Sequence, residues 1–233
     1  MRTMKLGTSP VTQLQAGLSI LAAARTVDTR PIKARLMAFE RAQNELNAAH
    51  AQVTAAEAQL AAAQTALDGL DADQDQHVDA MARALIADGL SRTNPFGVFG
   101  SAAPGALIAL PVADEAQAIH QLVIAIQRHK PLAEASVQAA HNLDNAARAV
   151  EEGLAHIETL QAALREARHT REAVAQRWTR AAAALKRGAR AAADDGAPQL
   201  YGMLFERPRK PNGKAAKPAP APQPAEPPAN PAS

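Results

Sequence analysis

Two stretches of this sequence repeat an apolar residue every seven positions, and this rhythm constrains the fold more than any other feature. The first stretch has one core position occupied by Phe39, Leu46, Val53, Leu60 and Leu67, and an Ala or Leu follows three residues after each. Steps of three and four residues keep side chains on one side of an α-helix. This stretch therefore predicts a long helix with a continuous apolar seam.

The second stretch carries the same rhythm nearer the C-terminus. Its core position is occupied by Leu143, Val150, Ile157, Leu164, Arg171, Trp178 and Leu185. We therefore expect two helices, over residues 31–90 and 131–193, of nearly equal length. Folding them back on each other buries both seams, which predicts an antiparallel coiled-coil helical hairpin about 90 Å long.

Aligning the two repeats also predicts which residues lie at the same height. If Phe39 is level with Leu185, then Val53 meets Arg171, the one charged member of its series. Arg171 would then lie close to Glu57, whose carboxylate could neutralise it at the seam.

Composition favours an all-α fold without a thick globular core. Alanine supplies much of the 47% hydrophobic content, and only 3% of the residues are aromatic. Alanine buries little area, but Ala, Leu, Gln, Glu and Arg lose little side-chain freedom in a helix. The composition thus agrees with long, slender helices.

The remaining segments divide around these helices. Residues 1–30 contain an amphipathic pattern that we expect to dock at the base of the hairpin, and residues 194–207 form an apolar return segment. Gly and Pro break the helical pattern within residues 91–130, which predicts a tip made of a loop and a short helix capped by Asp114. Residues 208–233 are rich in Pro and Ala, which predicts a disordered tail.

The tip is more apolar than a solvent-exposed loop usually is. Its candidate residues are Phe96, Val98, Phe99, Leu107, Ile108 and Leu110. We expect them to fold onto the apolar side of the following helix as a small core. The alternative is an exposed patch that docks on a membrane or another protein.

Charge is distributed unevenly, although the net charge is only +2. Residues 1–44 sum to +5, residues 45–163 to −10 and residues 164–233 to +7. In an antiparallel hairpin the two positive blocks meet at one end, which we call the basic end. The candidate interaction residues there are Lys33, Arg35, Arg177, Arg180, Lys186, Arg187, Arg190, Arg207, Arg209 and Lys210.

Several partners would suit a basic end. Nucleic-acid phosphates, an anionic membrane surface and the acidic shaft of another copy all carry the complementary charge, where the shaft is the part of the hairpin between the basic end and the tip. The alternative is that these side chains only solvate the helix ends and interact with the helix dipole. The sequence does not choose among these possibilities.

The motifs of enzymes and cofactor sites are missing from the sequence. It contains no cysteine, none of the seven histidines forms a zinc-protease pair, and Asp71–Asp75 lacks the glycine and glutamate of a calcium loop. We read these aspartates as solvated charge and expect no cofactor, no metal and no small-molecule substrate. The N-terminus resembles a signal peptide only weakly, because polar residues interrupt its apolar run, and we therefore expect a cytoplasmic protein. No apolar run is long enough to span a bilayer, so we do not expect an integral membrane protein.

These observations favour a non-enzymatic structural or adaptor protein that acts through protein–protein interaction or self-assembly. A nucleic-acid-associated protein that binds phosphates through the basic end and tail is the first alternative. A peripheral binder of membrane surfaces, acting through residues 1–30 or the tip, is the second.

Overall fold

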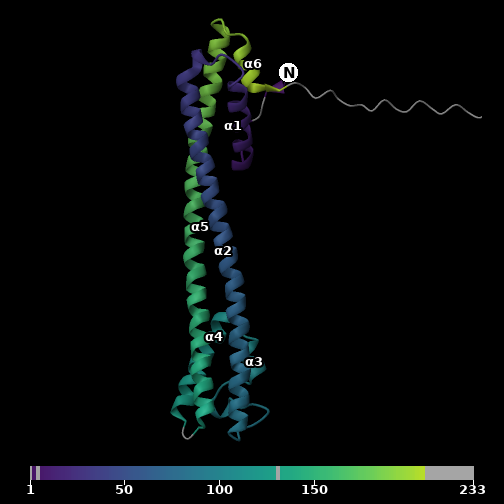
Figure 1. Cartoon of the computed structure of the whole chain (residues 1–233), viewed down its shortest axis with the longest axis vertical. Coiled ribbons are helices and arrows are strands. Elements are labelled where there is room, and N and C mark those ends of the chain that lie inside the picture. The colour runs from purple at the N-terminus through teal and green to yellow at the C-terminus, as the bar shows by residue number, and fades with distance from the viewer. Residues whose placement is uncertain (1, 4–5, 130–131, 208–233) are drawn as a thin grey trace, which may run out of the picture.

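Two long helices form the body of the molecule in the computed structural model, which describes residues 2–3, 6–129 and 132–207 (Figure 1). Helices α2 (Lys33–Ala87) and α5 (Glu134–Asp194) lie side by side and run in opposite directions. At 1.5 Å per residue, α2 is about 80 Å long and α5 about 90 Å. The chain is mostly helical, as the all-α prediction required.

Two shorter helices pack at the basic end. Helix α1 (Pro10–Ala24) begins after Ser9, whose hydroxyl accepts a hydrogen bond from the backbone N–H of Thr12, and Pro10 suits the first turn because it needs no donor there. Helix α6 (Gln199–Phe205) follows α5. Beside them, the two-residue strands β1 (Arg2–Thr3) and β2 (Glu206–Arg207) pair antiparallel.

Short elements connect the long helices at both ends. The 3₁₀ helix η1 (Arg30–Ile32) leads into α2. At the tip follow the 3₁₀ helix η2 (Gly97–Phe99), α3 (Pro104–Ile108) and α4 (Val112–Arg128), which packs beside α5. Helices α3 and α4 lie beside the end of α2 and the beginning of α5 and form the tip with them (Figure 1).

One apolar core holds the basic end together. It joins α1, α2, α5 and α6, and its largest fully buried side chains are Trp178, Phe39 and Phe205. The Phe39 and Trp178 rings lie 5.6 Å apart between centroids in a tilted arrangement. This contact joins the beginning of α2 to the last third of α5.

A second core lies at the tip. Met81 and Leu85 of α2, Ile119 and Leu122 of α4, and Leu143 of α5 are at most 1% exposed. Between the two cores, α2 has no buried residue after Val53 and before Gln74. The long helices are therefore packed tightly at both ends and more loosely in the middle.

Polar contacts between the long helices show their register. Glu45 lies 3.4 Å from Arg177, and Glu57 accepts a hydrogen bond of 2.8 Å from Arg168. The prediction that Glu57 would neutralise Arg171 is wrong. Arg168 takes that place, and the Nε of half-buried Arg171 has no hydrogen-bond partner.

The predicted cap of the tip helix is also wrong. Helix α4 begins at Val112 with Pro111 as its N-cap and no side-chain cap. Pro111 supplies extended backbone directly before the helix, so α4 begins two residues before Asp114, which lies in its first turn. The predicted start of the second long helix at Pro131 and the predicted disorder of residues 208–233 lie outside the described residues.

Candidate functional site

The outer face of α5 carries the most concentrated part of the predicted basic surface. Arg180, Arg187 and Arg190 are exposed. At about 100° per residue they fall on the side of α5 opposite the buried Trp178 and Leu185. We call these three residues the α5 arginine face. No ion pair reaches them within the described part of the chain.

Two neighbouring groups border the α5 arginine face. Lys186 is half-buried beside it. The Arg190 guanidinium lies 5.9 Å from the centre of the Tyr201 ring of α6. A cation over an aromatic ring is held in place while its outer side stays open to solvent. Arg190 thus lies against α6 through this ring.

Arg177, which was predicted to belong to the same patch, points elsewhere. Its guanidinium faces α2 and pairs with Glu45 at 3.4 Å, and both side chains are about half exposed. An exposed pair of this kind contributes little to stability. It does neutralise the charge that Arg177 would otherwise add to the surface.

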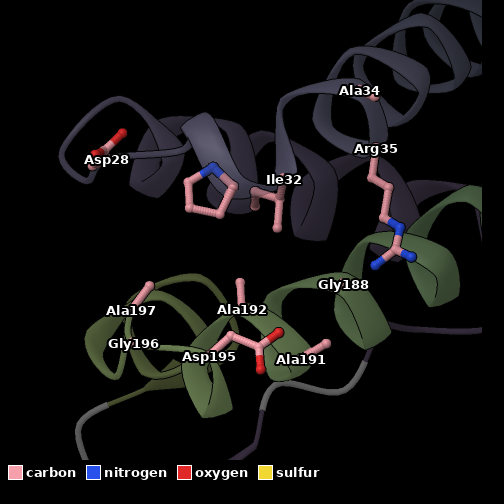
Figure 2. A pocket seen from close by; sticks show the side chains of 11 residues that line it. Asp28, Ile32, Ala34, Arg35, Gly188, Ala191, Ala192, Asp195, Gly196 and Ala197 are labelled. Carbon is pink, nitrogen blue, oxygen red and sulfur yellow. The ribbon is translucent and has the colours of Figure 1, made fainter.

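Arg35 crosses from α2 to α5 (Figure 2). A Cβ atom on Gly188 would lie 2.3 Å from Arg35 Nη1, so the absence of a side chain on Gly188 leaves room for the guanidinium. Arg35 and Gly188 line an open depression of about 600 Å³ between the start of α2 and the end of α5. Asp28 and Asp195 line the same depression.

The charges in this depression largely compensate one another. Asp28 forms a hydrogen-bonded ion pair with Arg30, which lowers the pKa of the Asp28 carboxyl. Asp195 adds a second carboxylate opposite Arg35. The depression is therefore a mixed-charge site, and the positive surface lies on the α5 arginine face.

The other predicted basic residues are dispersed. Lys33 is exposed, and its position about 120° around α2 from buried Phe39 directs it away from the seam. Arg207 is part of β2. Arg209 and Lys210 lie outside the described residues. The structure therefore brings together only part of the predicted patch.

A buried glutamine supports the basic end. Gln43 of α2 is 3% exposed, accepts a hydrogen bond of 2.7 Å from Trp178 Nε1, and donates one of 3.2 Å to the backbone carbonyl of Leu14 in α1. Gly17 provides the space, because a Cβ there would lie 1.7 Å from Gln43 Oε1. Gln43 thus connects the three helices, which the heptad pattern alone did not indicate.

The predicted apolar tip residues fall into two groups. Phe96 and Leu107 are at most 1% exposed, and Phe99 and Ile108 pack against the same core. Val98 is 60% exposed and Leu110 38%. Four of the six predicted tip residues thus pack in the tip core, and Val98 and Leu110 remain exposed.

An acidic cluster at the tip was missed by the sequence reasoning. Asp71 and Asp75, interpreted there as solvated charge, are half-buried, and Gln74 between them is fully buried. Glu115 of α4 is 1% exposed beside them. Two features of the sequence could have indicated this cluster. Polar Gln74 follows Leu67 by one heptad in α2, and the first turn of α4 is acidic.

We also searched the described residues for a metal site and for a membrane-spanning helix. In residues 2–3, 6–129 and 132–207, no group of three or more His, Cys, Asp or Glu side chains could hold a metal ion. Within the same residues, no helix combines the length and the apolarity required to cross a membrane. Helix α1 turns its apolar face into the core and leaves only Val11 and Leu18 as large exposed apolar side chains.

Comparison with known proteins finds no relative. The sequence matches no protein-family model, and neither the curated proteins nor the solved structures searched include one that is detectably similar to it.

Proposed function

We propose that this chain is a non-enzymatic structural or adaptor protein whose long helices form an antiparallel coiled-coil hairpin, and that it acts through protein–protein contact at its basic end. The observation that carries the proposal is the α5 arginine face, which is exposed and without ion pairs in the described part of the chain. Such a surface favours association with an acidic protein surface.

The arrangement of the long helices supports the role of a spacer. The heptad residues Phe39, Leu46, Trp178 and Leu185 are fully buried at the seam, as a coiled coil requires. The seam holds the basic end and the tip at opposite ends of an extended body (Figure 1). A slender body of this kind provides a long surface and separated ends.

The chain itself carries a complementary acidic surface. Exposed carboxylates follow the shaft toward the tip at Asp68, Asp73, Asp79, Glu152 and Glu158. The basic end of one copy can lie against the acidic shaft of another, with opposite charges facing. This complementarity makes a second copy a suitable partner, and we propose self-assembly as the leading form of the interaction.

Light scattering at low and high salt tests the proposal. We expect a particle heavier than one chain at low salt that dissociates to one chain at high salt, because salt screens exposed charges. The triple variant Arg180→Glu, Arg187→Glu, Arg190→Glu should stay a single chain at low salt. A single wild-type chain under both conditions would contradict self-assembly.

The tip provides a matched control. Arg83, Arg92 and Arg128 are exposed arginines far from the basic end in sequence and in structure. Reversing these three charges to Glu changes the net charge of the chain by the same amount. We expect this variant to assemble as the wild type does, so equal loss in both variants would show a net-charge effect.

The same arginine face supports nucleic-acid binding as a second function. Exposed guanidinium groups along a helix can contact successive phosphates without reading sequence. Binding to duplex DNA should then weaken steeply with added salt, and deletion of residues 207–217 should weaken it further. Absent or salt-insensitive binding would exclude this function.

A further inference from the structure

The first turn of α4 buries a carboxyl group against two others at the tip. Glu115 is 1% exposed, and its neighbours on α2 include Asp71, fully buried Gln74 and Asp75. Buried oxygens of all three acidic side chains, Glu115 Oε1, Asp71 Oδ1 and Asp75 Oδ1, lack a hydrogen-bond partner, as do both amide atoms of Gln74. Buried polar atoms are seldom left unsatisfied, so the cluster is a costly arrangement.

No cation compensates for these acids in the described part of the chain. Neither Asp71, Asp75 nor Glu115 takes part in an ion pair. On α2, Asp79 adds a further negative charge near Asp75. The cluster is therefore uniformly acidic on the side of α2.

The titratable groups between α4 and α5 pair with one another. His120 of α4 lies 2.8 Å from Asp144 and 3.3 Å from Glu151, both on α5. Arg148 pairs with Asp144 at 2.8 Å. These contacts leave the Glu115 side of α4 without a basic partner.

The neighbouring Asp71 and Asp75 carboxylates favour a protonated Glu115. Burial raises the pKa of Glu115 to about 7; the Gln74 amide acts against this, and the Asp75 and Asp71 carboxylates add to it. Burial and the Asp71 charge also raise the pKa of Asp75. A protonated Glu115 carboxyl can donate a hydrogen bond to the Asp75 carboxylate. This hydrogen bond would join α4 to α2.

We propose that Glu115 and Asp75 form a proton-dependent latch that holds the first part of α4 against α2. With the proton bound, the pair can form a hydrogen bond across the two helices. When the proton leaves, a buried carboxylate faces two others, and the start of α4 separates from α2. This inference does not depend on what the basic end binds.

Opening of the latch would uncover apolar surface. Ala116 and Ile119, the next residues of α4 that face the core, are fully buried in the same core as Val78 and Met81 of α2. Separation of the helices would expose these side chains to solvent. The tip would thus be closed in mildly acidic solution and open more often above neutral pH.

Hydrogen exchange of the intact protein, followed by mass spectrometry, tests the latch. After correction for the intrinsic dependence of exchange on pH, the start of α4 should open about tenfold more often at pH 8 than at pH 6. Opening increases about tenfold per pH unit up to the pKa of Glu115, about 7, and levels off above it. Glu115→Gln should remove this difference. An unchanged difference in Glu115→Gln would overturn the proposal.

Three further variants keep the test decisive. Asp114→Asn alters the exposed acid next to Glu115 and should leave the difference intact. His120→Gln should also retain it, and loss in this variant alone would assign the pH response to the α4–α5 contact instead. Asp75→Asn removes one facing carboxylate and should move the transition to lower pH, which a purely structural role of Glu115 would not produce.

Discussion

At the scale of single residues, Gln43 shows why a buried polar group can determine a packing arrangement. Its amide satisfies the Trp178 indole and the Leu14 carbonyl at once, and Gly17 leaves the space that it needs. The sequence places Gln43 next to the seam residue Ala42 and gives no sign of burial. Only the position of α1, which the heptads do not specify, reveals its role.

Replacing Gln43 tests this role directly. Gln43→Leu keeps a similar volume but leaves the indole N–H and the carbonyl without partners, so we expect a loss of about 2 kcal/mol or more in the free energy of unfolding. Urea unfolding followed by fluorescence of Trp178, the single tryptophan, measures it. Gln52→Leu, at an exposed site on the same helix, is the control and should change stability by less than about 0.5 kcal/mol.

Glu115 makes the stability of the tip dependent on pH. Its folded pKa, about 7, exceeds the ordinary value of 4.5, so the folded state holds the proton more tightly. The stabilisation is fully present below pH 4.5 and is lost as pH rises toward about 7. The shift corresponds to about 3 kcal/mol at most, since relaxation of the tip relieves part of it.

Thermal unfolding followed by circular dichroism between pH 4.5 and 8 measures this loss. We expect the transition of the wild type to move to lower temperature over that range. In Glu115→Gln the movement should be smaller, because the amide does not ionise. Parallel behaviour of the two proteins would mean that other groups set the pH dependence.

At the scale of elements, the sequence predicts most of the long helices and little of what surrounds them. Seven-residue spacing indicates one buried side of α2 and α5, because the period follows from helix geometry. The N-cap of α4 and the partner of Glu57 depend on tertiary placement. A single side chain can reach several neighbours one turn apart, so spacing alone did not distinguish Arg168 from Arg171.

The shaft should be less protected than either end. Helix α2 has no buried residue after Val53 and before Gln74, whereas the two cores contain large buried side chains. Opening there exposes little apolar surface and costs little free energy. Native-state hydrogen exchange should find faster exchange over residues 56–70 than over residues 39–49 or 78–85, and equal protection along α2 would contradict this.

At the scale of the whole molecule, the separation of charge follows from sequence order and helix pairing together. The two positively charged blocks are far apart in the chain, and their described parts meet because α2 and α5 run in opposite directions. The sequence alone therefore indicated a basic end. It did not indicate that Arg177 would pair with Glu45, or that the exposed arginines would gather on α5.

The central claim is that an extended hairpin holds the basic end and the tip apart. Small-angle X-ray scattering at high salt, where association is screened, measures the shape of the single chain. We expect the profile of a thin rod with a largest dimension of at least about 90 Å, the length of α5. A compact particle about half as long would mean that α2 and α5 fold back on themselves in solution, and it would contradict the hairpin and the functions built on it.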